Sequence, residues 1–417
     1  MSGSEVAPAG RLLAADPLLS GDVDLTVVLI VLGKTVVVFA LLLISVLFYI
    51  WFMRKVMAQM QNRVGPDRAG PFGSLQSLAD GIKLFFKEQS IPESADRTVF
   101  RLAPYLSILP AFLAFAIIPI GGPVVIAGNT TYLQLADLPI GMLWLLAMSG
   151  LGVYGVMLAG WSSGSKYPLL GSVRASAQLL SYESAFSLAI VGVIVQANTL
   201  STRGIVDQQS WDGIGSIVDG WFLLPAFVAF VIFVIAATAE INHPPFDLVE
   251  AEQELVGGFH TEYTGIRFAI FFLAEFMNLV TMSAIAVTLF LGGPAGPGLG
   301  FLAANGWFNA WVMPFFWFLL KLLVLLFATV WLRTTVPRLR YDQLMDFGWR
   351  FLIEVAFLWV MVSAVVMVAR DQDWNLWIVV PVAAVGALAV YGLLYLCMPK
   401  RSSGARAPVL EPESEAV

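Results

Sequence analysis

The chain has 417 residues, of which 59% are hydrophobic and only 12% charged, and its formal net charge is −6. Soluble domains carry about 25% charged residues, so this chain has too few charges for a water-facing surface. The composition therefore excludes a soluble enzyme, a nucleic-acid-binding protein and a disordered tail.

Long apolar runs divide the sequence into segments that could cross a membrane. A helix of about 20 apolar residues spans a bilayer, and continuous apolarity argues against the alternating strands of a β-barrel. The expected fold is an all-α polytopic membrane protein with about nine transmembrane helices. The predicted spans are residues 25–52, 102–121, 140–160, 182–196, 221–240, 266–291, 312–332, 350–368 and 376–398. Residues 25–398 are thus expected to form a transmembrane domain between a flexible tail (1–24) and a polar cytoplasmic tail (399–417).

The polar stretch after the first span contains an amphipathic pattern. Apolar residues recur at spacings of three and four, which places them on one face of a helix: Phe72, Leu75, Leu78, Ile82 and Phe85. Charged residues occupy the other face: Asp80, Lys83 and Lys87. This pattern predicts a surface helix that lies on the membrane, on a partner, or on the rest of this protein.

Lys and Arg are distributed unequally between the two sets of loops. With the N-terminus outside, 18 of them lie in inside segments, three lie outside (Arg11, Arg203 and Arg370), and two lie within spans (Lys34 and Lys321). Inside loops carry the excess of basic residues in membrane proteins. We therefore expect the N-terminus outside and the C-terminus inside.

An acidic stretch follows the fifth span, where a basic inside loop is expected. Residues 240–262 contain no Lys or Arg but six carboxylates: Glu240, Asp247, Glu250, Glu252, Glu254 and Glu262. If residues 247–254 are helical, Asp247, Glu250 and Glu254 share one face and cannot all ionise freely, so they would share protons. The alternative is a solvated acidic loop.

Further ionisable residues lie in or beside the predicted spans: Lys34, Glu183, Glu240, Glu275, Lys321 and Glu354. Charges in membrane segments usually face the bundle interior or a hydrated path. The pattern therefore indicates a hydrated route from the inside face towards the membrane centre.

Cysteine and histidine are too scarce for a metal or electron-transfer centre. The chain has one cysteine and two histidines, His243 and His260. One cysteine cannot hold an iron–sulfur cluster, a structural zinc or a disulfide. If the protein takes part in redox chemistry, another subunit must carry the electrons.

Ordered motifs give the sequence a resemblance to a known family. In chain order they are QNRVGPDR (61–68), LADGIKL (78–84), GWSS (160–163), SKYP (165–168), SYE (181–183), AEIN (239–242), PFDL (245–248), EY (262–263), FFLAE (271–275) and RLRYDQLM (338–345). In this order they resemble the H subunit family of bacterial NADH–quinone oxidoreductase, respiratory complex I. The likeness covers roughly residues 25 to 370.

The resemblance implies a quinone-binding membrane subunit of a proton-pumping oxidoreductase in the bacterial inner (cell) membrane, which is not catalytic alone. It implies no cofactor or metal on this chain, with FMN and iron–sulfur clusters in partner subunits of the peripheral arm and quinone as the substrate. The implied quinone-binding residues are Arg54, Gln61, Arg63, Phe246 and Arg340. The implied proton path comprises Glu183, Glu240, Asp247, Glu250, Glu252, Glu254, Glu262 and Glu275.

The sequence departs from the family pattern at three positions. Met53 stands where the family usually shows glutamate, His243 where it shows arginine, and Glu354 where it shows proline. The first two departures remove a charge near the implied quinone cavity at neutral pH.

Other functions are weighed against this one. The nearest is the homologous membrane subunit of a membrane-bound hydrogenase or formate-oxidising complex, although the quinone-loop motifs favour complex I. A secondary transporter often shows two similar halves, and this sequence shows no such repeat. A purely structural anchor would not explain the carboxylates within the spans.

Overall fold

The computed structural model describes Asp16, Leu18 and residues 24–209, 220–247, 255–296 and 306–397. The long helices are α1 (Leu25–Met60), α3 (Arg97–Phe115), α4 (Gly141–Ser162), α5 (Lys166–Ala197), α8 (Phe227–Glu240), α10 (Gly265–Phe290), α11 (Gly306–Thr335), α13 (Ile353–Asp371) and α14 (Leu376–Cys397). The short elements are η3 (Pro71–Gly73), α2 (Gln76–Phe86), α6 (Thr202–Gln208), η4 (Gly258–His260), α12 (Tyr341–Phe347), the π-helical turn η6 (Gly348–Leu352), and strands β1 (Pro123–Ile126) and β2 (Asn129–Tyr132).

Every predicted span overlaps one of the long helices. Seven helices of the described residues are long and apolar enough to cross a membrane, and the protein is an all-α polytopic membrane protein. The fifth and ninth predicted spans are present as α8 and α14, whose apolar parts are shorter. The start predicted for the fourth span, residue 182, was wrong, because α5 begins at Lys166. Its first turns use small residues such as Gly171 and Ser172, which are buried but not apolar enough to register as a run.

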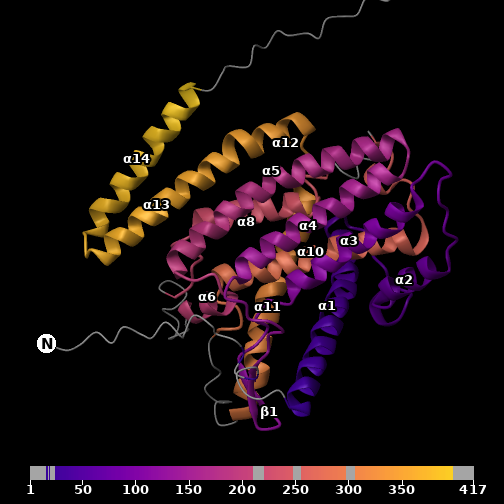
Figure 1. Ribbon diagram of the computed structural model, residues 1–417, viewed down its shortest axis with the longest axis horizontal. Helices are drawn as coiled ribbons and strands as arrows, with labels where there is room; N and C mark the ends of the chain where they lie inside the picture. The colour runs from indigo at the N-terminus through magenta and orange to yellow at the C-terminus, as the bar shows by residue number, and fades with distance from the viewer. Residues whose placement is uncertain are drawn as a thin grey trace, which may run out of the picture.

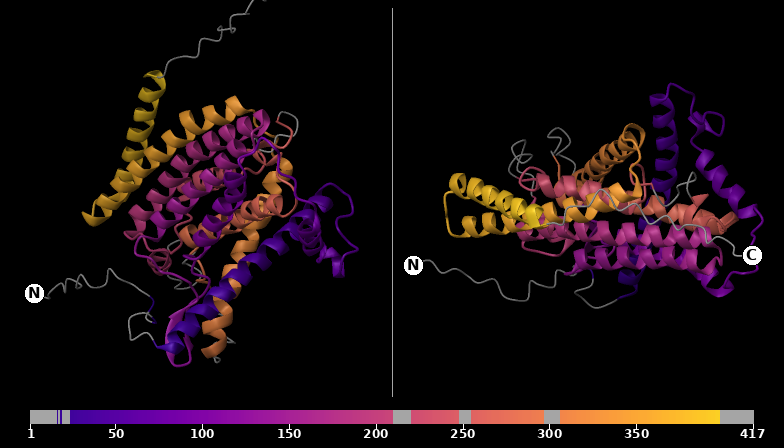
Figure 2. Two further views of the ribbon diagram at one scale, coloured as in Figure 1. Left: turned by 45° about the vertical axis from the view of Figure 1, so that its right-hand side comes forward. Right: turned by 90° about the horizontal axis from the view of Figure 1, so that it is seen from above.

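The helices form a bundle with α10 at its centre. Of the long helices, α10 is the most buried, and it packs against α1, α3, α8 and α11. The ring of Phe233 in α8 contacts those of Phe186 in α5, tilted at 4.8 Å, and of Phe290 in α10, edge to face at 5.5 Å. In Figures 1 and 2, α1 and α11 lie at a steep angle to the other long helices, and α14 packs along α13 at one edge.

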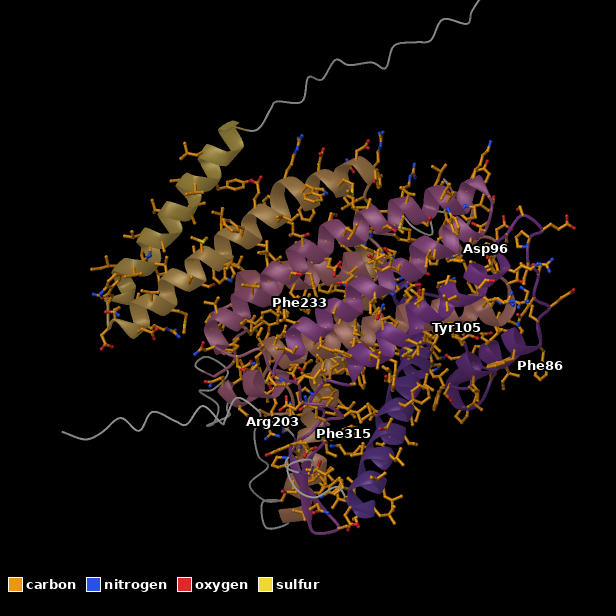
Figure 3. All side chains as sticks on the ribbon, in the orientation of Figure 1. Phe86, Asp96, Tyr105, Arg203, Phe233 and Phe315 are labelled. Atoms are coloured by element: carbon orange, nitrogen blue, oxygen red, sulfur yellow. The ribbon has the colours of Figure 1, made fainter. Side chains whose placement is uncertain are left out.

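The loops predicted to share one side of the membrane meet at one end of the bundle, which we call the α2 end. There the amide of Asp96 donates to the carbonyl of Ser162 (3.0 Å), and the amide of Leu339 donates to the carbonyl of Pro245 (3.1 Å). Arg203 in α6 marks the opposite end, which we call the α6 end (Figure 3). The alternation of the loops therefore follows the predicted topology, whereas the side of the membrane that each end faces stays a prediction.

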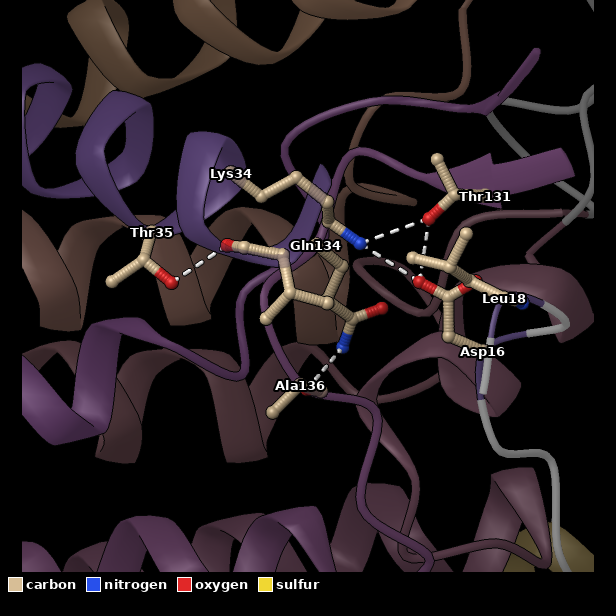
Figure 4. Close-up of polar contacts among 8 residues, drawn as sticks. Asp16, Leu18, Lys34, Thr35, Thr131, Gln134 and Ala136 are labelled. Atoms are coloured by element: carbon tan, nitrogen blue, oxygen red, sulfur yellow. Dashed lines mark hydrogen bonds and ion pairs between the residues drawn. The ribbon is translucent and has the colours of Figure 1, made fainter. Parts of the chain in front are cut away.

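The α6 end holds a hairpin that the spans did not predict. Strands β1 and β2 pair antiparallel across Ala127 and Gly128, both with positive φ, as in the tight turns that match strand twist. Lys34 of α1 reaches this hairpin, where its ammonium group lies 2.8 Å from the carboxylate of Asp16 and 2.9 Å from the hydroxyl of Thr131 (Figure 4).

The predicted amphipathic helix is α2. Its polar face turns towards α1, and its apolar face is exposed: Leu78 is 48%, Ile82 51% and Phe85 69% exposed. The described residues of the chain therefore leave this apolar face uncovered.

Candidate functional site

Three carboxylates from different helices meet at one cavity inside the bundle. Glu183 of α5, Glu240 at the end of α8 and Glu275 of α10 line a space of about 80 Å³. Five other polar side chains lie on its wall: Ser107, Ser149, Asn242, His260 and Asn278. We call these eight side chains and the space between them the acidic cavity.

The turn after α8 fixes the position of Glu240. Asn242 adopts a left-handed backbone conformation (φ 58°), and two prolines that cannot continue a helix follow it. Gln178 of α5 donates through Nε2 to the carbonyls of Ala239 (2.8 Å) and Phe246 (2.9 Å). One amide thus holds both sides of the turn, so Glu240 and Phe246 keep a fixed spacing.

Two of the carboxylates approach neighbouring residues of α4. The hydroxyl of Ser149 donates to Oε1 of Glu240. A Cβ atom added to Gly150 would lie 3.3 Å from Oε1 of Glu183, so the glycine leaves room for that carboxylate. Neighbouring carboxylates repel each other when both are charged, so such a pair tends to share a proton.

The third carboxylate has a histidine partner. Nδ1 of His243, in the turn after α8, lies 3.0 Å from Oε1 of Glu275. The imidazole is buried and meets the ring of Phe276 edge to face at 5.6 Å. The turn after α8 and the wall of the acidic cavity are therefore joined by an ionisable pair.

The size of the cavity limits what it can hold. A buried water needs roughly 10–15 Å³ of such space, so the cavity is large enough to hold water. Carboxylates, hydroxyls and amides supply the polar partners that ordered water needs. The acidic cavity can therefore carry protons between carboxylates, but it is too small for a ring-bearing substrate.

The predicted quinone-binding residues fall into two groups at the α2 end. The first group, Arg54, Gln61 and Arg63, lies on and just beyond the last turns of α1, where both Gln61 and Arg63 are exposed. Nη1 of Arg54 lies 2.6 Å from Oδ2 of Asp80 in α2. Partial burial raises the pKa of Asp80, but hydrogen bonds from Arg54 and Gln76 outweigh burial and hold this pKa below its ordinary value of 3.8.

The second group is Phe246 and Arg340. Phe246 is buried beside Tyr182, with ring centroids 5.4 Å apart. Arg340 is the N-cap residue of α12, and Nη2 lies 3.0 Å from Asp342. The hydrogen bond between Leu339 and Pro245 brings the loops of both residues together.

The structure also shows the surroundings of the other two departures from the family pattern. The thioether of Met53 accepts a hydrogen bond from Nη1 of Arg333 (3.3 Å), so α1 and α11 meet here, at the α2 end, through a thioether and a guanidinium group. Glu354 lies in the first turn of α13, which follows the π-helical turn η6, and its Oε2 is buried with no hydrogen-bond partner among the described residues.

The remaining predicted acidic residues do not join the acidic cavity in the described part of the chain. Asp247 ends the turn after α8, and Glu262 lies in the turn before α10. Glu250, Glu252 and Glu254 lie outside the described residues, so the predicted shared helical face is untested.

The sequence analysis missed the neutral polar lining of the cavity. Ser107, Ser149 and Asn278 lie within apolar helices α3, α4 and α10. Isolated polar residues in membrane spans are a usable signal, because they face the bundle interior or a cavity.

The two lysines within spans were expected to belong to the same hydrated route, but they lie at the α6 end. Nζ of Lys321 donates to three carbonyls of the segment after α10: Leu291 (2.6 Å), Gly293 (3.0 Å) and Ala295 (2.5 Å). We call this arrangement the Lys321 clamp.

Among the described residues, no three His, Cys, Asp or Glu side chains gather in a group that could hold a metal ion.

Comparison with known proteins places the chain in a family. A family model described as NADH dehydrogenase matches residues 33–364. The NADH-quinone oxidoreductase H subunit of Frankia alni is 54% identical over 384 residues, covering 91% of this chain and 82% of the relative. The protein of the same name from Frankia casuarinae is 54% identical (91% and 82% covered), and that from Streptomyces avermitilis is 45% identical (92% and 84% covered). The chain therefore belongs to the family of NADH-quinone oxidoreductase H subunits, which are membrane subunits of respiratory complex I.

Proposed function

We propose that this protein forms part of the quinone chamber at its α2 end and that the acidic cavity is the start of the proton path. Membership of the H subunit family supports this function over a role in a hydrogenase or formate-oxidising complex. Electrons would reach quinone from FMN and iron–sulfur clusters of peripheral-arm subunits, and the complex would lie in the bacterial cell membrane with the α2 end inside.

The quinone chamber would use both groups of predicted residues. Arg54, Gln61 and Arg63 offer donors for the carbonyl oxygens of a quinone head, and Phe246 offers an aromatic face. Arg340 lies in the loop that is bonded to the turn of Phe246. A partner subunit would close the chamber between the two groups, which matches the exposure of Arg63 and Arg340.

The observation that carries the proton path is the convergence of Glu183, Glu240 and Glu275 on one water-sized cavity. Reduction of quinone adds negative charge that needs protons, and this charge biases the protonation of nearby carboxylates. The turn held by Gln178 keeps Glu240 at a fixed distance from Phe246, and this supports a route between the two sites that passes through Glu240. Coupling would then be electrostatic, through a hydrated chain of shared protons.

The test is Glu240→Gln in membranes that contain the assembled complex. The amide keeps the shape of the side chain but removes its proton, so quinone reduction and pumping should fall together, by about 100-fold, the lower end of what a positioned proton-transfer group contributes. Glu254→Gln should behave alike, and Glu252→Gln should matter less. Glu93→Gln is the control, because Glu93 is exposed and does not line the cavity. Parent-like turnover and pumping in Glu240→Gln, at equal complex content, would overturn the proposed path.

A further inference from the structure

His243 lies where the proposed quinone chamber and the acidic cavity meet. Its side chain is 7% exposed, and Nδ1 contacts Oε1 of Glu275, whose side chain is 21% exposed. Because both groups are largely excluded from water, their charge states depend strongly on each other. A proton on His243 favours the carboxylate form of Glu275, and loss of that proton removes the attraction.

The backbone of His243 is tied to the residue that would face quinone. The amide of Phe246 donates to the carbonyl of His243 (2.9 Å), and the amide of His243 donates to the carbonyl of Thr238 (3.3 Å). Gln178 binds the same turn from α5. A shift of the His243 ring relative to Glu275 is therefore transmitted to Phe246 within one tight turn.

Several ionisable groups surround the pair and contribute to its charge balance. On α1, Tyr49 contacts Phe276, the same ring that His243 meets, and it interacts electrostatically with Glu275 and with Arg333 of α11. Glu240 precedes the turn and Asp247 follows it, and Arg340 lies in the loop bonded to the turn. The imidazole is the group whose ordinary pKa, about 6.5, lies in the working range.

We propose that the His243–Glu275 pair is a protonation-dependent link that positions Phe246 for quinone and sets the charge of Glu275 in the acidic cavity. With the imidazole protonated, the ion pair holds the turn against α10 and keeps Glu275 ionised. With the imidazole neutral, the turn is held less firmly and Glu275 becomes free to take a proton. His243 is thus a positioning residue, and the inference rests on the proposed function.

The experiment compares pH profiles of quinone reduction by the assembled complex between about pH 5 and pH 9, a range that brackets the titration of histidine. The parent should show an inflection that His243→Gln lacks, because glutamine does not titrate. His243→Arg has a permanent charge, so it should also lack the inflection. Its rate of quinone reduction should stay at the level that the parent shows on the acid side of the inflection. The KM for quinone should rise about tenfold in His243→Gln, with a smaller change in kcat.

Two further variants make the result decisive. His260→Gln removes the other histidine of the chain and should keep the inflection, whatever its rate. Glu275→Gln should remove the inflection. The double variant with His243→Gln should lose less activity than the two single variants predict when their losses are added as free energies, because both changes break one interaction. If His243→Gln does not assemble, Glu275→Gln and His243→Arg carry the same test.

An inflection that persists in both His243→Arg and Glu275→Gln would overturn the inference. The proposed function has its own readout in Glu240→Gln. An impaired Glu240→Gln with unaltered pH profiles at His243 would reject the link alone, whereas a parent-like Glu240→Gln would reject the proton path itself.

Discussion

The α6 end and the acidic cavity both hold charged side chains inside the protein, but the surroundings of these side chains differ. At the α6 end, the ammonium group of Lys321 donates all three of its protons to backbone carbonyls at 2.5–3.0 Å. In the acidic cavity, Oε2 of Glu240 is buried with no hydrogen-bond partner among the described residues, and space for water lies beside it. The three carbonyls hold the ammonium group of Lys321 in one position, whereas a carboxylate with open hydrogen-bonding positions can exchange a proton through water.

This difference separates structural from functional charges within the membrane. Removal of a saturated charge leaves several acceptors without donors and should mainly affect folding and assembly. Removal of a carboxylate from the acidic cavity should mainly affect turnover, because water can bond to what remains. Lys321→Met and Ser149→Ala test this division, and Glu240→Gln represents the functional charges in the comparison.

The largest loss of assembly is expected for Lys321→Met. The change leaves the carbonyls of Leu291, Gly293 and Ala295 without their donor, at about 1–3 kcal/mol for each unsatisfied group. The amount of assembled complex in membranes, measured against Glu240→Gln, should drop severalfold. Normal assembly with lost pumping would contradict the division, because it would make Lys321 a functional charge.

A smaller and purely functional effect is expected for Ser149→Ala. This variant removes the hydroxyl that donates to Glu240, and a hydrogen bond to a charged group contributes about 1.5–3 kcal/mol. Turnover should fall about tenfold at unchanged assembly. Ser184→Ala is the matched control, since the exposed hydroxyl of Ser184 donates to the carbonyl of Leu180 in its own helix. Equal turnover in the two variants would show that Ser149 does not act through Glu240.

The sequence predicted the helices well because a bilayer forces backbone groups to bond within each apolar run. It also identified Glu183, Glu240 and Glu275 as unusual, since charges in apolar runs are rare. Their convergence was not predictable from their spacing, because it depends on how α5, α8 and α10 cross. The first turns of α5 and the hairpin β1–β2 were missed because small residues and short strands leave no hydropathy signal.

For the same reason, the sequence could not separate the two lysines within spans from the carboxylates of the acidic cavity. Hydropathy marks Lys34 and Lys321 as charges within spans, just as it marks Glu183. Which charges are saturated is decided by backbone carbonyls and loop residues such as Asp16 and Ala295, which come from distant parts of the chain. Whether a buried charge is structural or functional therefore depends on whether its hydrogen-bond partners are complete. Only the three-dimensional structure shows those partners.

The smallest effect is expected at the surface, where α2 is attached to α1 by Arg54 and Asp80. The pKa of Asp80 is depressed in the folded protein, so its contribution is fully present above its ordinary value of 3.8 and is lost as the pH falls through the lower folded value. Hydrogen-exchange protection of α2, corrected for intrinsic rates, should thus be constant at neutral pH and should decline only in strong acid. Asp80→Asn should lower protection slightly at neutral pH, because exposed pairs contribute only about 0–1 kcal/mol.

Asp67→Asn is the control for this last prediction, since Asp67 is 61% exposed and lies 3.3 Å from Lys55. It should leave α2 unchanged, because neither residue belongs to that helix. A large loss of quinone reduction in Asp80→Asn, without loss of α2 protection, would place Asp80 with the cavity carboxylates as a functional charge. The expected small change would instead place it with Lys321, as a charge whose partners are already complete and whose role is to hold an element in position.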